Sequence, residues 1–139
     1  MIVLDTNTLS ETLKPSPSEK VLSWLAAHEP LAVFTTTITQ AEILYGVERL
    51  PAGKRRARLY SIVESLFAEE FEGRIWPFDE EAARLFAKIV THREDIGRSI
   101  SQSDAMIAAI ALSREAAVAT RNTRDFDGCG VRIVNPWTE

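Results

Sequence analysis

The chain opens with MIVLDTNTLSE, residues 1–11, in which an apolar run passes directly into a carboxylate. Residues 1–5 predict a first strand, because a short apolar run bounded by turn-forming residues is typical of a buried strand. Asp5 ends this run. A carboxylate next to a hydrophobic core costs free energy unless it is hydrogen-bonded, paired with a cation or bound to a metal. The stretch therefore predicts a polar site at the end of the first strand.

Helical and strand patterns alternate along the rest of the chain. Apolar residues at helical spacing predict helices over residues 18–28, 39–50, 54–71, 79–95 and 101–115. Shorter apolar runs predict strands over residues 31–36, 74–78, 117–120 and 131–135. This alternation favours an α/β fold with a parallel sheet and helices on both faces. Such sheets bind ligands beyond the carboxyl ends of their strands, where the strand order reverses. In a five-stranded sheet of order 3-2-1-4-5, Asp5 and Thr120 flank that point.

Length and composition fit one domain spanning residues 1–139. Contents of 45% hydrophobic and 26% charged residues are ordinary for a globular protein, and the length allows a sizeable core. No apolar run reaches the roughly 20 residues of a membrane helix, and the first residues lack the pattern of a secretory signal. The single cysteine, Cys129, excludes an internal disulfide and a cysteine-based zinc site. These features favour the cytoplasm and no contact with a membrane.

Two predicted helices begin with a hydroxyl residue, two further residues and an acid, in Thr39-Gln40-Ala41-Glu42 and Ser101-Gln102-Ser103-Asp104. A capping box explains either pattern, because its acid bonds back to the helix N-terminus. A metal site also explains them, because the helix dipole keeps a first-turn carboxylate ionised, as a metal ligand must be. Asp104 shares its helix face with apolar residues and is expected to be buried. Gly46, one turn after Glu42, suggests that something packs closely there, because glycine destabilises a helix interior.

A fourth acid follows the fourth predicted strand, in the segment Thr120-Arg121-Asn122-Thr123-Arg124-Asp125-Phe126. Asn122 and Asp125 are also ordinary turn residues. Asp127 competes with Asp125 for the role. Asp125 is preferred because it lies closer to the strand end and because Phe126 can anchor it to the core.

The basic residues give a weaker signal. The net charge of −4 argues against a broad nucleic-acid-binding surface, but it allows a local basic rim around an acidic pocket. Arg121 and Arg124 flank the proposed acidic loop and are candidates for contact with an RNA backbone. The cluster of basic residues over residues 54–58 is more simply explained as a solvated helix face than as a nucleic-acid contact.

Converging carboxylates repel one another, and without a cation some of them would take up protons. An all-oxygen cluster selects hard cations, Mg²⁺ or Mn²⁺. Such a cation accepts phosphate oxygens, makes a bound water more acidic and stabilises a leaving oxygen, which is the chemistry of phosphodiester hydrolysis. The chain has no glycine-rich phosphate loop and no G-x-S-x-G motif, and His28 and His92 are expected on helix surfaces.

Other classes of protein also place an aspartate after the first strand of an α/β sheet. A haloacid-dehalogenase-like phosphohydrolase needs Asp-x-Asp and a late lysine, but Asn7 takes the second position and no lysine follows Lys88. A receiver domain needs an aspartate at the end of strand three, where Asp79 looks like a helix cap. A catalytically inactive module of the same fold that binds a partner is the non-enzymatic alternative, and an intact acid set argues against it.

Four motifs together resemble the PIN-domain ribonucleases, and more narrowly the VapC-type toxins of bacterial toxin–antitoxin pairs, close to the FitB subgroup. The resemblance covers essentially the whole chain. The motifs are Asp5-Thr6-Asn7, Gln40-Ala41-Glu42-Ile43-Leu44-Tyr45-Gly46, Asp104-Ala105-Met106-Ile107-Ala108-Ala109, and Thr120-Arg121-Asn122 leading to Asp125-Phe126. The resemblance implies a PIN-like three-layer sandwich around the parallel sheet.

The resemblance also implies a site and partners. The catalytic and metal-binding quartet around Mg²⁺ or Mn²⁺ would be Asp5, Glu42, Asp104 and Asp125. Asn7 and Thr120 would support the quartet by hydrogen bonding, with Asn122 beside them. The activity would be endonucleolytic cleavage of RNA, often a structured RNA such as tRNA or rRNA. A small VapB- or FitA-like antitoxin would inhibit the protein and carry the pair to its promoter DNA, and the toxin would form a homodimer.

Overall fold

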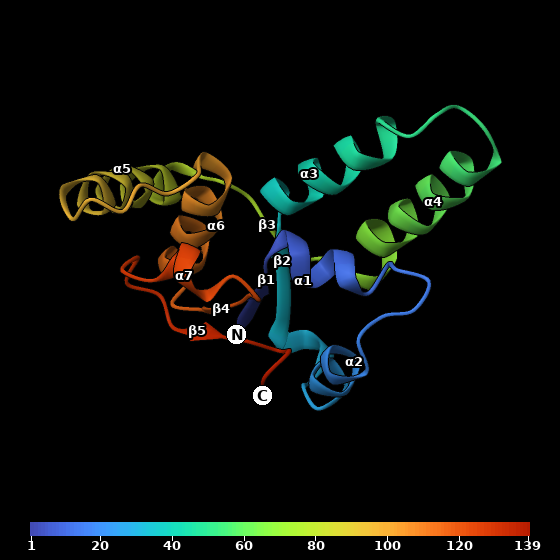
Figure 1. The fold of residues 1–139 in the computed structure, drawn as a ribbon, viewed down its shortest axis with the longest axis horizontal. Coiled ribbons are helices and arrows are strands. Elements are labelled where there is room, and N and C mark those ends of the chain that lie inside the picture. Colours follow the sequence, from blue (N-terminus) through green and yellow to red (C-terminus); the bar gives the residue numbers. More distant parts are fainter.

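The computed structural model describes residues 1–139 and contains one five-stranded sheet in the order β3-β2-β1-β4-β5 (Figure 1). All neighbouring strands are parallel. The strands are Ile2–Leu4 (β1), Val33–Thr36 (β2), Ile75–Trp76 (β3), Ala117–Ala119 (β4) and Ile133–Val134 (β5). Each strand lies within the range predicted for it, and the predicted order 3-2-1-4-5 is confirmed. Every helix is too short or too polar to span a lipid bilayer.

Helices connect the strands and cover the sheet. The helices are Thr6–Glu11 (α1), Glu19–Ala26 (α2), Thr37–Glu48 (α3), Lys54–Ser65 (α4), Glu80–Asp95 (α5), Gln102–Ser113 (α6) and Thr123–Phe126 (α7). A short 3₁₀ turn, Pro30–Ala32, precedes β2, and α4 continues as a π-helical stretch, Leu66–Glu70. The helix predicted over residues 54–71 is therefore present but changes its winding after Ser65.

The central strand β1 is buried on both faces. Val3 packs in a core with α5, α6 and α7, whereas Ile2 and Leu4 pack in a second core with α1, α3 and α4. This division follows from strand geometry, because successive side chains point to opposite faces of a sheet. The two cores make a three-layer sandwich, with α5 and α6 on one side of the sheet and α3 and α4 on the other (Figure 1). The predicted fold class is confirmed.

The start of α3 and the presence of the short helices α1 and α7 differ from what the sequence predicts. The helix α3 begins at Thr37 because Thr36 caps it, with its hydroxyl accepting the Thr39 N–H at 3.1 Å. The capping-box interpretation of Thr39 and Glu42 is therefore wrong, and Glu42 lies in the second turn. The helix α1 was not predicted. It begins directly after Asp5, whose carboxylate accepts the Thr8 N–H at 2.8 Å and so caps the helix.

Candidate active site

Asp5 lies at the carboxyl end of β1, where the strand order reverses between β1 and β4. Its side chain is only 3% exposed. Burial raises the pKa of Asp5 above its ordinary value, hydrogen bonds from Thr120 and Thr8 oppose this rise, and the Glu42 charge adds to it. The Thr8 hydroxyl also donates to the Ala119 carbonyl at 2.9 Å, so α1 is tied to the end of β4. Asp5 is thus a fixed carboxylate that is partly destabilised in its charged form.

Asp104 lies in the first turn of α6, behind the Ser101 cap. The Ser101 hydroxyl accepts the Asp104 N–H at 3.2 Å. The side chain is half-buried rather than fully buried. Burial raises the pKa of Asp104, a hydrogen bond with the Ser101 side chain lowers it, and the charges of Asp125, Asp5 and Glu42 raise it further. The charged form of the Asp104 carboxylate is therefore disfavoured by three other acids that come from distant parts of the chain.

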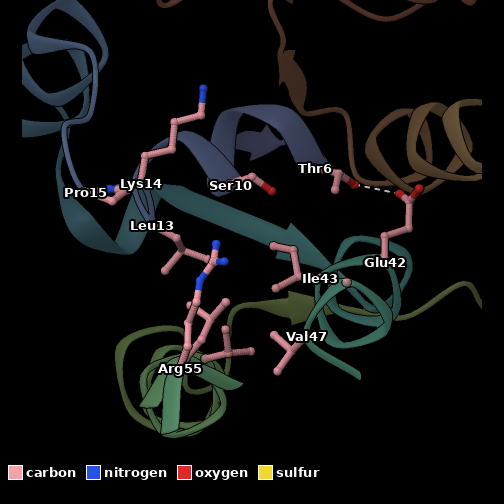
Figure 2. A pocket seen from close by; sticks show the side chains of 12 residues that line it. Thr6, Ser10, Leu13, Lys14, Pro15, Glu42, Ile43, Val47 and Arg55 are labelled. Atoms are coloured by element: carbon pink, nitrogen blue, oxygen red, sulfur yellow. Dashed lines mark hydrogen bonds between the residues drawn. The ribbon is translucent and has the colours of Figure 1, made fainter. Parts of the chain in front are cut away.

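Glu42 projects from α3 toward α1 (Figure 2). Its Oε1 accepts a hydrogen bond from the Thr6 hydroxyl at 2.6 Å, and the Thr6 and Thr39 hydroxyls lie 3.1 Å apart. Glu42 is exposed and forms no ion pair with a lysine or arginine. Its orientation is therefore set by a neutral hydroxyl, and its charge stays available to a ligand.

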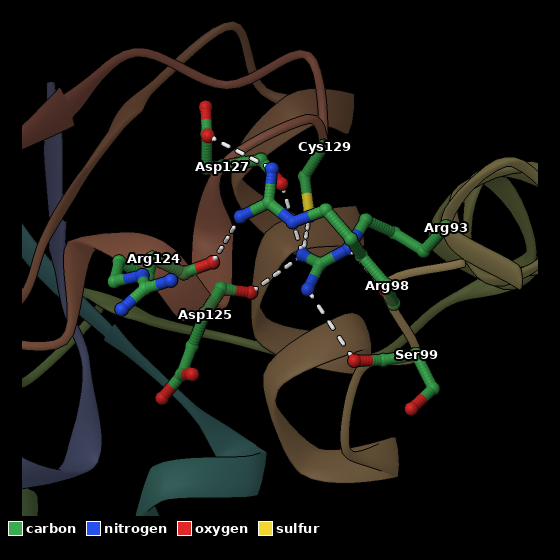
Figure 3. A network of polar contacts seen from close by, with 7 residues as sticks. All are labelled: Arg93, Arg98, Ser99, Arg124, Asp125, Asp127 and Cys129. Carbon is green, nitrogen blue, oxygen red and sulfur yellow. Dashed lines mark hydrogen bonds and ion pairs between the residues drawn. The ribbon is translucent and has the colours of Figure 1, made fainter. Parts of the chain in front are cut away.

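The loop acids Asp125 and Asp127 have different surroundings. The Oδ2 atom of Asp127 pairs with Nη1 of Arg98 at 3.1 Å. The Asp125 carboxylate makes no hydrogen bond or ion pair and points away from the arginines (Figure 3). Phe126, which is 1% exposed, anchors α7 in the core. This arrangement favours Asp125 over Asp127 as the fourth acid of the site.

The residues expected to support the site differ in the hydrogen bonds that they make. Thr120 is fully buried, hydrogen-bonds with Asp5 and accepts the Asn122 N–H at 3.0 Å. Asn7 is exposed, and its side chain makes no hydrogen bond to the acids. Thr6 and Thr8 make the bonds instead. Sequence reasoning missed both threonines because it did not identify α1, whose first turn presents them.

The two candidate RNA-contacting arginines are exposed on the loop after β4. The Arg121 guanidinium lies over the Trp137 ring at 5.3 Å from the ring centre. Arg124 accepts a hydrogen bond from Arg98 through its backbone carbonyl, at 3.4 Å, and its own side chain makes no bond. The Asn122 side chain does not cap α7. Both arginines are therefore accessible from solvent beside the acids.

A groove of about 330 Å³ adjoins Glu42, between α1, α3 and α4 (Figure 2). Thr6, Leu13, Ile43 and Arg55 contribute to its walls. Gly46 opens onto this groove, and a Cβ atom built on Gly46 would meet nothing within 4 Å. The close packing expected at Gly46 is therefore wrong for the isolated chain.

The donor chemistry of the acids fits a hard divalent cation, because every candidate ligand atom is a carboxylate oxygen. A cation would also relieve the repulsion that raises the pKa of Asp104. The side chains do not form a closed metal site, since no three His, Cys, Asp or Glu side chains are arranged to hold an ion. Asp5 and Asp104 are fixed by helix caps, whereas Glu42 and Asp125 are exposed.

Comparison with known proteins assigns this fold to a family. Residues 2–129 match the family model of the PIN domain. The chain belongs to the PIN-domain family.

The relatives narrow this assignment. The VapC ribonuclease Y4jK of Sinorhizobium fredii is 39% identical over 137 residues, covering 99% of this chain and 98% of that protein. The toxin FitB of Neisseria gonorrhoeae is 40% identical, covering 99% of both chains. A chain in the solved structure of FitAB bound to an IR36 DNA fragment matches with a TM-score of 0.93 at 40% identity, covering 99% of this chain and 96% of that chain. The resemblance to VapC-type toxins close to FitB is confirmed, and the phosphohydrolase alternative gains no support.

Proposed function

We propose that this protein is a divalent-metal-dependent endoribonuclease and the toxin of a toxin–antitoxin pair. The observation that carries the proposal is the environment of the Asp104 carboxylate, whose pKa is raised first by burial and then by the charges of Asp125, Asp5 and Glu42. Acids from three other parts of the chain thus act on Asp104 at the carboxyl edge of the sheet. The similarity to proteins named VapC ribonuclease and toxin FitB supports the same conclusion.

Asp5, Glu42, Asp104 and Asp125 would hold Mg²⁺ or Mn²⁺. When bound, the cation supplies acidity to a water molecule and stabilises the leaving oxygen of the phosphodiester. The chain itself positions the acids. Helix caps fix Asp5 and Asp104, and the Thr6 hydroxyl orients Glu42 while leaving its second carboxylate oxygen without a partner.

The partners belong to the same proposal. RNA would approach over the exposed Arg121 and Arg124 beside the acids. The inhibitor would be a FitA-like antitoxin, and promoter DNA would be bound through that antitoxin, since the similar FitAB complex has been solved on DNA. Residues 1–139 would act as one domain, as a homodimer in the cytoplasm.

The test incubates the purified protein with labelled structured RNA in Mn²⁺, in EDTA, and as the Asp5→Asn variant. Asparagine retains the ability to cap α1, so the variant is expected to fold. Cleavage should occur only for the wild-type protein with metal. Equal cleavage in all three reactions would reveal a contaminating nuclease and remove the proposal. No cleavage with any metal, despite RNA binding, would favour the inactive binding module.

A further inference from the structure

Arg93, near the C-terminal end of α5, is only 4% exposed and has no carboxylate partner. A buried charge without a counter-ion is costly, so its hydrogen bonds have to compensate. The side chain lies beneath the loop that carries Asp125 and Asp127 (Figure 3). The helix dipole favours a cation in the last turn of α5, but it does not by itself account for a cation that is buried against this loop.

The Arg93 guanidinium donates from all three of its nitrogens and bonds four backbone carbonyls. Nε donates to the Arg98 carbonyl at 2.6 Å, and Nη2 donates to the Ser99 carbonyl at 3.4 Å. Nη1 donates to the carbonyls of Asp125 at 2.8 Å and Asp127 at 2.9 Å, with a longer contact of 3.5 Å to the Cys129 sulfur.

These four carbonyls belong to two different segments. Residues 98–99 lie in the α5–α6 connection, which leads directly into the Ser101 cap and Asp104. Residues 125–127 lie in α7 and the turn after it, which present Asp125. We propose that Arg93 is a positioning residue that sets the spacing between the Asp104 and Asp125 carboxylates by tying these two segments together. This inference rests on the proposed function, in which both carboxylates hold the metal.

Arginine suits this role better than lysine, because a planar guanidinium presents five N–H donors in a fixed fork. A lysine ammonium retains the charge but cannot hold both segments in the same geometry. Arg98 adds an outer brace through its contacts to Asp127 at 3.1 Å and to the Arg124 carbonyl at 3.4 Å. The Arg98 and Asp127 side chains are both exposed, so their ion pair is expected to contribute less than Arg93 to holding the loop in place.

The chain offers a matched control in Arg74. Its guanidinium also bonds three backbone carbonyls, those of Pro30, Val33 and Glu70. These carbonyls lie in segments that carry none of the four acids. Arg74→Lys therefore removes the same kind of clamp without touching the proposed metal site, whereas Arg93→Lys removes the clamp between Asp104 and Asp125.

The experiment measures Mn²⁺ affinity from the electron paramagnetic resonance signal of free Mn²⁺, with circular dichroism to confirm folding. The variants are Arg93→Lys and Arg74→Lys, each in the wild-type and the Asp125→Ala background. Arg93→Lys should weaken Mn²⁺ binding about 10-fold, as for other residues that orient metal ligands. In the Asp125→Ala background its further effect should be within about twofold, because the spacing no longer matters. Arg74→Lys should have no effect.

Amide hydrogen exchange gives a second readout. Arg93→Lys should accelerate exchange in residues 122–129, and Arg74→Lys should not. An equal loss of Mn²⁺ affinity in both backgrounds, an equal loss for Arg74→Lys, or unchanged affinity for Arg93→Lys would overturn the inference while leaving the proposed function intact. Wild-type protein that neither bound Mn²⁺ nor cut RNA would remove the proposed function. Faster exchange in Arg93→Lys would then mark Arg93 as structural only.

Discussion

Thr6, the first residue of α1, donates a 2.6 Å hydrogen bond to Glu42 of α3. The bond joins the helix after the first strand to the helix after the second, and it fixes an otherwise exposed carboxylate. Two of the proposed metal ligands are therefore controlled by one short segment, since Asp5 caps α1 and Thr6 orients Glu42.

The first prediction concerns this hydroxyl. Thr6→Val removes the donor at nearly constant volume, so Glu42 loses its orientation while the fold is retained. RNA cleavage should fall about 10-fold, equivalent to about 1.4 kcal/mol of transition-state stabilisation. Single-turnover kinetics would measure the change. Thr12→Val is the control, because the Thr12 hydroxyl makes a 2.7 Å bond to the Leu9 carbonyl at the other end of α1, away from Glu42. A similar loss in both variants would contradict a role specific to Thr6.

A second prediction concerns stability without metal. Asp104→Asn removes one of several carboxylates that repel one another, so the melting temperature in EDTA should rise. The rise should be about 3 °C for each kcal/mol gained in the free energy of unfolding. The stabilisation by millimolar Mn²⁺ should shrink in the same variant, because ligand binding stabilises the native state by mass action. Differential scanning calorimetry would measure both. Asp127→Asn serves as the control, since Asp127 is paired with Arg98 and its loss relieves no repulsion. An unchanged or lower melting temperature for Asp104→Asn would count against the repulsion argument.

A third prediction concerns pH. The pKa of Asp104 is raised in the folded protein, first by burial and then by the neighbouring acids. The folded state therefore binds a proton that the unfolded chain has already lost, and the metal-free stability rises as pH falls through the folded pKa. Once protonated, Asp104 is neutral like asparagine. The stability advantage of Asp104→Asn in EDTA should thus be largest at neutral pH and vanish near pH 4.

Urea denaturation of both proteins across this pH range would measure the difference. Glu11 acts in the opposite direction, because its bonds to Lys14 and to the Ser18 N–H lower its pKa, so its contribution is lost as pH falls. Both proteins contain Glu11, so its effect cancels in the comparison. A pH-independent difference would show that the Asp104 charge is not what destabilises the native state.

The fourth prediction separates the two loop acids. Asp125→Asn should reduce cleavage at least about 10-fold, because it removes a free carboxylate beside Asp104. Asp127→Asn should change cleavage by no more than about twofold, because the Asp127 carboxylate is engaged by Arg98. Initial rates on one labelled RNA would compare them. The reverse order of effects would assign the fourth position to Asp127.

The sequence allowed the sheet and two of the acids to be predicted because their signals are local. A run of apolar residues ended by Asp5 marks a strand end, and Ser101 followed by Asp104 marks a helix start. Glu42 was selected partly on a wrong argument, since Thr36 rather than Thr39 caps α3. The short helix α1 gave little periodicity, so Thr6 and Thr8 were overlooked in favour of Asn7.

Arg93 illustrates what sequence patterns omit. On the chain it is one more charged residue in the last turn of a helix, where it suits the helix dipole. Its burial and two of its four carbonyl partners depend on a segment more than thirty residues later, so no local pattern indicates them. Contacts between residues so far apart in the sequence form only when the helices and strands pack together.

The position of β1 has a consequence for synthesis. Of the five strands, β1 comes first in the chain yet lies in the middle of the sheet, and one of its two neighbours, β4, is made only after residue 116. Thr120, which hydrogen-bonds with Asp5, and Asp125 follow later still. A growing chain therefore lacks the complete set of acids until residue 125 has been added, so the proposed site can assemble only after β4 and α7 have been made.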